Sequence, residues 1–368
     1  MENGEHLVIF TTPSKDDGVR LQIEKTVDTH GKHRDLRLKQ LPHMETALQA
    51  LRDGRGDIVA MSAFDWIKHG QSDLSIVGVL PRKEPTWVLV SPDKPEYLKN
   101  GALLMCDHEL VRRQMKRFRP DVRLLSMHEI VKELKHSDSF NSLDEDDIWP
   151  WFEQRLLNGE IDGFIVPRSV HAGHKMKSRR HTLGLQRDQT EIDRERFIPP
   201  PLYGFTLLVA REGFPKTNVR EMVDSSAELA YRLEVTMTET LDPKLQQITG
   251  FYAEQRKVAT FLKKANEDGD DTLLTSLVDP NQKRGRLYQG GPRVELLIET
   301  LDPTGRFTAC CERIVLPEHG HNALITLLKD FLELLNIMTT DHDATKRIIP
   351  GMPHNFNQAK PRLMDLGV

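Results

Sequence analysis

The chain has 368 residues, of which 38% are hydrophobic and 29% are charged, and its formal net charge is −4. This length suffices for two or three domains with apolar cores, and the negative balance argues against a general nucleic-acid binder, which is usually basic. Three cysteines, Cys106, Cys310 and Cys311, are too few for a disulfide framework or a cysteine-based zinc site, so we expect a reduced, cytoplasmic protein. The first residues lack the pattern of a signal peptide, and no run approaches the ~18 apolar residues of a membrane span.

Strand and helix patterns alternate through the first hundred residues, which is typical of an α/β lobe. The predicted strands are Leu7–Phe10, Leu36–Leu41, Ile58–Met61 and Leu74–Leu80, and the predicted helices are Gly18–Thr29 and Met44–Arg52. The small polar loop Thr11–Lys15 lies at a helix N-terminus, a position that favours an anion. Pro92–Asn100 is interpreted as a crossover into another domain.

Two polar residues, Ser62 and Asp65, follow the strand Ile58–Met61. Ligands of open α/β sheets gather outside the carboxyl ends of strands. Phe64 and Trp66 flank Asp65 and could remove water from it, which would change its pKa. The alternative is structural, because serine and aspartate at a strand-to-helix turn are common helix caps.

The next hundred residues repeat the α/β pattern. Strands are predicted at Ala102–Met105 and Val122–Leu125, with a helix between them that carries Arg112 and Arg113. These arginines could bind a ligand or form a solvated basic face. An acidic surface insertion is expected at residues 136–147. His171, His174 and His181 raise a metal hypothesis, but their basic neighbours favour a solvent-facing cluster.

The last part of the chain is predicted to be a smaller α+β domain. The expected elements are a return strand within Leu202–Arg211, a helix over Glu221–Thr238, a hairpin over Val294–Val315 and an apolar helix over Leu324–Leu335. Asp302-Pro303-Thr304-Gly305 supplies the residues of a tight hairpin turn. Residues 255–289 are an extra charged segment, and the tail from Thr339 is expected to be loosely held.

Several motifs in this order resemble the hydroxymethylbilane synthase (porphobilinogen deaminase) family. The matching positions are Asp53, Gly54, Asp57, Ser62, Asp65, Leu80, Pro81, Arg82, Pro85 and Ser91, followed by Arg112-Arg113-Gln114, Gly204 and Gln246–Glu254. The chain departs from the family at several positions. Thr12 stands where an arginine is expected, Phe64 replaces a lysine, and the cofactor cysteine falls at about Gln246.

The resemblance implies an α/β fold with two periplasmic-binding-protein-like lobes with mixed sheets plus a smaller α+β third domain. The predicted first lobe covers residues 1–98 and 199–214, the second 99–198, the third domain 215–338, and the tail 339–368. These boundaries follow the family's domain order.

The resemblance also implies a function in tetrapyrrole biosynthesis, the stepwise condensation of four porphobilinogen molecules. Asp65 would be catalytic, and the substrate would be bound by Ser14, Lys15, Ser62, Arg112, Arg113 and Gly204. In the family, the growing pyrrole chain is attached to a dipyrromethane cofactor, which a cysteine thioether holds. Because that cysteine is missing here, no cofactor is predicted, and the sequence does not decide whether the protein is catalytically active. The alternative is a non-catalytic monomer that binds a small anionic ligand or tetrapyrrole between two lobes, without nucleic acid or membrane. A solute-binding protein or a phosphoribosyltransferase remains a further possibility.

Overall fold

A computed structural model describes residues 6–31, 35–70, 72–83, 85–184, 196–277, 291–340 and 362–367. The chain forms two compact units. Unit 1 contains residues 1–107, 121–186 and 201–235, and unit 2 contains residues 108–120, 187–200 and 236–368. Each unit is described by itself.

Unit 1 holds two five-stranded mixed sheets, and the first sheet has the strand order β2-β1-β3-β10-β4. β1 is parallel to β2 and β3, whereas β10 is antiparallel to β3 and β4. The strands are β1 Leu7–Thr11, β2 Leu36–Gln40, β3 Ile58–Ser62, β4 Leu74–Val79 and β10 Thr206–Arg211. The helices of this lobe are α1 Val19–His30, α2 Met44–Arg52 and α3 Ala63–His69. Ile9, Ile23 and Ile58 are fully buried in its core, which fits their apolar periodicity.

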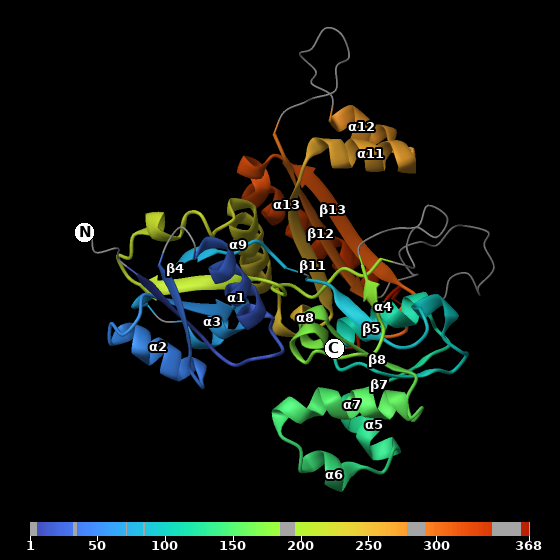
Figure 1. The fold of residues 1–368 in the computed structure, drawn as a ribbon. Helices are drawn as coiled ribbons and strands as arrows, with labels where there is room; N and C mark the ends of the chain where they lie inside the picture. The colour runs from blue at the N-terminus through green and yellow to red at the C-terminus, as the bar shows by residue number, and fades with distance from the viewer. Residues whose placement is uncertain are drawn as a thin grey trace, which may run out of the picture. The chain divides into compact units, whose positions relative to one another are not determined.

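The second sheet repeats this pattern with the order β7-β6-β8-β5-β9. β6 is parallel to β7 and β8, and β5 is antiparallel to β8 and β9. The strands are β5 Trp87–Val90, β6 Leu103–Met105, β7 Arg123–Leu125, β8 Gly163–Pro167 and β9 Arg180–Leu183. The helices are α5 Met127–Glu133, α6 Ser137–Asn141, α7 Ile148–Leu157 and α8 Arg168–Gly173. In Figure 1, α5, α6 and α7 gather in one layer, and their buried residues share a core with β5, β6 and β8.

Each sheet therefore contains one antiparallel strand that comes from the other half of unit 1. β10 returns to the first sheet after the second lobe, and β5 enters the second sheet directly after β4. This is the predicted α/β fold with two periplasmic-binding-protein-like lobes, and it is confirmed by the strand order. The crossover lies earlier than predicted, before Trp87 rather than at Pro92–Asn100, because a buried apolar strand gives no sequence signal for the sheet that it joins.

Unit 2 is built on the antiparallel sheet β11-β12-β13. The strands are β11 Thr249–Arg256, β12 Arg293–Leu301 and β13 Thr308–Val315. The helices of unit 2 are α4 Glu109–Phe118, α10 Pro243–Gln246, α11 Val258–Asp268, α12 Asp271–Ser276 and α13 Gly320–Thr339, while most of α9 Ser225–Thr240 belongs to unit 1. α13 packs along the sheet through Leu324, Leu327 and Phe331 (Figure 1). The smaller α+β domain of the prediction is therefore present.

Two segments differ from their predicted character or grouping. The helix α4 was predicted within the second lobe, but it belongs to unit 2 and packs on β12. The acidic segment at residues 136–147 forms α6, whose Phe140 is buried against Trp151, so this segment contributes to the core of the second lobe. The charged segment at 255–289 contains α11 and α12, and its residues 278–290 lie outside the described residues, as do residues 341–361 of the tail. Among the described helices, none has the length and apolar character of a membrane span.

Candidate functional site

A pocket of about 470 Å³ lies between the two lobes of unit 1. We call it the interlobe pocket. Its lining residues are Ser14, Asp16, Asp17, Ser62, Phe64, Asp65, Trp87, Met105, Asp107, Met127, Trp149, Ile165, Val166, Pro167, Val170 and Tyr203. Most of these follow or end the parallel strands β1, β3, β6 and β8, so the carboxyl ends of strands from both sheets face the pocket.

Ser62 and Asp65 form one unit at the start of α3. Asp65 Oδ2 accepts a hydrogen bond of 2.7 Å from Ser62 Oγ, and Ser62 Oγ accepts one of 3.1 Å from the Asp65 backbone N–H. Ser62 is therefore the N-cap of α3. The capping alternative is confirmed for Ser62, and both Ser62 and Asp65 also line the pocket, so a functional role for Asp65 stays a prediction.

A second carboxylate, Asp17, is held in the loop between β1 and α1. Asp17 Oδ1 accepts a 2.9 Å hydrogen bond from the backbone N–H of Val19, and Ser14 also bonds to the carboxyl group. Burial, and then the negative charges of Asp65 and Asp16, raise the pKa of Asp17 to about 6. Asp17 is not among the predicted site residues, although Asp16-Asp17 directly before a glycine and a helix is a capping signal in the sequence.

Aromatic side chains form another part of the wall. The Tyr203 ring lies edge-on to Phe64 at 4.9 Å and to Trp87 at 5.5 Å between ring centroids. Trp149 of α7 also lines the pocket. Burial raises the pKa of Tyr203 to about 12, so its phenol is neutral at physiological pH. The pocket thus combines four aromatic rings with four carboxylates, and among the described residues that line it there is no lysine, arginine or histidine.

The loop that carries Ser14 is fixed to the second lobe. Lys15 Nζ lies 2.6 Å from Asp146 Oδ2, and His174 Nε2 lies 2.7 Å from Asp16 Oδ1. Ser169 Oγ donates to the Asp16 carbonyl at 2.5 Å. A Cβ atom on Gly173 would lie 1.7 Å from the Lys15 carbonyl oxygen, so only glycine allows this approach. Lys15, which was predicted to bind substrate, forms an ion pair between the two lobes in this structure.

Gly204 does not line the interlobe pocket, and its position is explained by the backbone. Its φ is +79°, its carbonyl accepts a 3.0 Å hydrogen bond from the Lys83 N–H, and an added Cβ would lie 2.3 Å from the Lys83 carbonyl. The two chain segments that connect the lobes are in close backbone contact here. Glycine is therefore required at position 204 by the backbone conformation and by this close contact.

The predicted arginines lie on α4 in unit 2. Arg113 is buried, and it donates to Glu109 Oε1 at 2.8 Å and to the Leu301 carbonyl at 2.7 Å. Its side chain therefore forms hydrogen bonds in the interior of unit 2, and Arg113 is not among the residues that line the interlobe pocket. Arg112 is half-buried and lies 3.8 Å from Glu109. Gln246, at the expected cofactor position, donates its amide to the carbonyls of Thr238 and Leu241.

The three histidines of the metal hypothesis have separate partners. His171 Nε2 lies 3.0 Å from the Ser178 carbonyl, and His181 Nε2 lies 3.1 Å from the Ser91 carbonyl, while His174 pairs with Asp16. Within the described ranges, no group of three or more histidine, cysteine, aspartate or glutamate side chains is placed to hold a metal ion.

Comparisons with known proteins give matches only among solved structures. No family model and no curated protein matches the sequence. Similar structures include YhfZ from Shigella flexneri (15% identity, 64% of this chain and 98% of that chain, TM-score 0.28). A periplasmic substrate-binding protein of an ABC transporter from Coxiella burnetii has 11% identity over 60% of this chain and 94% of its own, with a TM-score of 0.34. The aliphatic sulphonate binding protein SsuA from Escherichia coli has 13% identity over 98% and 94%, with a TM-score of 0.30. Scores this low support no inference about function.

Proposed function

We propose that the protein binds a small ligand between its two α/β lobes, and that this ligand carries a positively charged amine. The composition of the interlobe pocket carries the proposal. Four carboxylates and four aromatic rings line it, without a described cation among the lining residues. Carboxylates pair with ammonium groups, and aromatic faces attract them further through cation–π interactions.

The sequence predicted an anionic ligand instead. An anion in this pocket would face Asp17, Asp65 and Asp107 without a compensating lining cation, which is unfavourable. Burial is the main cause of the raised pKa of Asp17, and the negative charges of Asp65 and Asp16 raise it further. A bound ammonium group would relieve this repulsion, so the geometry favours a cation over the predicted anion.

The proposal is tested by calorimetric titration with probes of opposite charge. Choline and putrescine represent cationic ligands, and glutarate represents an anion of similar size. We expect the two cations to bind and glutarate to give no saturable heat. Binding of glutarate, or no binding of either cation, would contradict the proposal.

A variant pair locates the binding. Asp65→Asn should weaken cation binding by ~1.5–3 kcal/mol, about 10- to 150-fold, because a charge-assisted contact is lost. Asp53→Asn removes an exposed carboxylate that pairs with Arg55 at the end of α2, and it should leave the affinity unchanged. Equal effects of both substitutions would indicate a general charge effect rather than a site.

Porphobilinogen remains a second candidate ligand. Ser14, Ser62 and Asp65, three residues matched to the hydroxymethylbilane synthase family, line the same pocket, and this observation favours it. Porphobilinogen has a protonated aminomethyl group that could pair with Asp65, but also two carboxylates that find no lining cation. Titration with porphobilinogen, followed by an assay for its consumption, would separate binding from turnover.

A further inference from the structure

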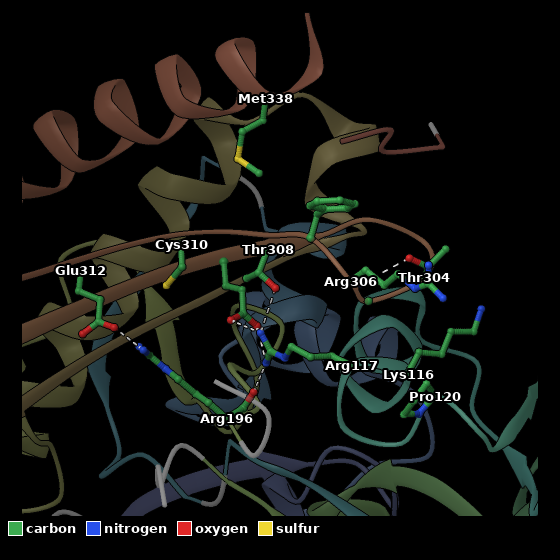
Figure 2. A pocket seen from close by; sticks show the side chains of 13 residues that line it. Lys116, Arg117, Pro120, Arg196, Thr304, Arg306, Thr308, Cys310, Glu312 and Met338 are labelled. Atoms are coloured by element: carbon green, nitrogen blue, oxygen red, sulfur yellow. Dashed lines mark hydrogen bonds and ion pairs between the residues drawn. The ribbon is translucent and has the colours of Figure 1, made fainter. Parts of the chain in front are cut away.

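Unit 2 contains a second cavity, of about 910 Å³, which the proposed function does not use. It lies where the end of α4 meets the turn between β12 and β13. We call it the arginine cavity, and its lining residues are Lys116, Arg117, Pro120, Arg196, Glu299, Thr304, Gly305, Arg306, Phe307, Thr308, Cys310, Glu312 and Met338. Figure 2 shows the Arg117 side chain reaching the backbone of Arg196, while the Arg196 side chain extends toward Glu312.

The turn is built tightly against α4. Gly305 has φ +72°, and an added Cβ would lie 2.5 Å from the Arg117 backbone nitrogen and 2.6 Å from the Arg113 carbonyl. Asp302 holds the turn by accepting hydrogen bonds from the backbone N–H groups of Thr304 and Phe307. The walls of the cavity are therefore fixed by backbone packing.

Two buried arginine side chains form part of the cavity wall. Arg117 donates to Glu299 Oε2 at 2.7 Å and to the Arg196 carbonyl, and Arg196 donates to Glu312 (Figure 2). In each of these pairs, one glutamate neutralises the positive charge of one arginine. Lys116 and Arg306 also line the cavity and have no carboxylate partner within the part of the chain that the structure describes, so the lining has an excess of two positive charges.

Some donors of the buried arginines lack an acceptor. The side chains of Arg117 and Arg196 are 7% and 5% exposed. Arg117 Nε and Arg196 Nη2 are buried, and neither has an oxygen or nitrogen acceptor among the described residues, although the Arg196 side chain also interacts with the Cys310 thiol. Buried N–H groups are rarely left without an acceptor, and each one that is left has a cost. An oxyanion in the cavity would provide the missing acceptor and balance the charge.

We propose that the arginine cavity is an anion-binding site for a small molecule with a carboxylate or phosphate group. Arg196 Nη2 would donate to the anion from the wall, while Lys116 and Arg306 would attract it from the more exposed side. Thr304 and Thr308 add hydroxyl groups to the same lining. The site belongs to unit 2 and does not depend on the cation proposed for the interlobe pocket.

The test is a titration with inorganic phosphate and, separately, with succinate, at constant ionic strength set by sodium chloride. We expect saturable binding of at least one anion. The double variant Lys116→Ala/Arg306→Ala should weaken it at least about tenfold, since two charge-assisted contacts are lost. Tighter phosphate binding would assign a phosphate compound, and tighter succinate binding a carboxylate.

Two further variants serve as controls. Lys263→Ala/Lys329→Ala removes two exposed cations of unit 2 that do not line the cavity, and it should leave the affinity unchanged. Arg196→Lys keeps a positive charge beside Glu312 but removes Nη2, and it should also weaken binding while thermal unfolding reports that the fold is intact. No saturable binding, equal weakening in the control double variant, or full binding by a folded Arg196→Lys variant would overturn the proposal. Choline binding by all these variants should stay unchanged, which separates this site from the interlobe pocket.

Discussion

Arg82 and Glu234 lie 152 residues apart in the sequence and form a bidentate ion pair in the interior of unit 1. Arg82 Nη1 donates to Glu234 Oε1 at 2.6 Å, and Nη2 donates to Oε2 at 3.0 Å. The Glu234 side chain is fully buried, and it also accepts the backbone N–H of Leu202. Arg82 additionally lies over the Phe205 ring at 4.1 Å. The pair thus ties both strand connections between the lobes to α9.

We predict that Glu234→Gln strongly destabilises the protein. The substitution leaves the buried Arg82 guanidinium without its counter-charge, and breaking such a pair costs about 3–5 kcal/mol. Urea unfolding at pH 7 measures the change. Asp73→Asn is the matched control, because it breaks the exposed pair with Arg52 and should have a much smaller effect. A similar loss of stability in both variants would contradict the claim that burial makes the Arg82–Glu234 pair important.

A second prediction concerns the backbone at Gly204. Gly204→Ala should destabilise unit 1 by more than about 2 kcal/mol, because alanine is strained at positive φ and its Cβ would collide with the Lys83 carbonyl. Gly213 has a similar φ of +81°, but nothing lies within 4 Å of an added Cβ. Gly213→Ala should therefore lower the free energy of unfolding only through the backbone strain of alanine at positive φ, by about 1 kcal/mol. Equal losses in urea unfolding would show that the close approach at Gly204 is unimportant.

The third prediction follows from Asp17, whose pKa is raised to about 6 by burial and by neighbouring aspartates. A raised folded-state pKa means that folding favours the protonated acid. Its contribution to stability is present below about pH 4 and is lost as the pH rises through about 6. Asp17→Asn, which resembles the neutral acid, should therefore be more stable than the wild type above pH 6, by up to about 3 kcal/mol at ~1.4 kcal/mol per pKa unit.

Unfolding by urea at pH 4 and pH 7.5 checks this prediction. The gap in stability between Asp17→Asn and the wild type should widen from the lower to the higher pH. Asp53→Asn serves as the comparison, because that carboxylate is exposed at the end of α2. An Asp17→Asn variant that loses stability at pH 7.5 would show that the charged form of Asp17 is the one that the fold prefers.

Much of the fold could be read from local patterns. The strand predicted at Ile58–Met61 is β3 with one added residue, and Ser62 caps the next helix as its position suggested. Strand-end placement also brought Ser14, Ser62 and Asp65 into one pocket. These successes share a cause, because apolar periodicity and capping depend on residues close together in the sequence.

Contacts between residues far apart in the sequence could not be predicted. One acceptor of Arg113 is the carbonyl of Leu301, 188 residues further along the chain. An arginine pair on a helix does not indicate in sequence which member becomes buried. The sequence also did not indicate that Asp17, Asp65 and Asp107 line one pocket, because they come from three separate segments whose proximity only the fold establishes.

The last prediction is that the purified protein carries no dipyrromethane. In the hydroxymethylbilane synthase family, a cysteine thiolate attacks an electrophilic pyrrole and forms the carbon–sulfur bond that anchors the growing chain. Here the matching segment before β11 contains Gln246, whose carboxamide is a poor nucleophile and is already bonded to two backbone carbonyls. Cys310 lies on β13, and burial raises the pKa of its thiol to about 12, so almost no thiolate is present at neutral pH. The Cys311 pKa is also raised, again mainly by burial.

An intact-mass measurement of the purified protein decides the question, since a dipyrromethane would add two linked pyrrole units to the mass of the chain. We expect the unmodified mass, a negative Ehrlich reaction, and no release of hydroxymethylbilane from porphobilinogen. A positive Ehrlich reaction with an adduct of two pyrrole units would contradict the prediction. If that adduct then disappeared in Cys310→Ser but persisted in Cys311→Ser, the anchor would lie in the arginine cavity, where the positive lining could pair with the pyrrole carboxylates. Loss of the adduct in neither variant would point to Cys106, which is buried at the end of β6.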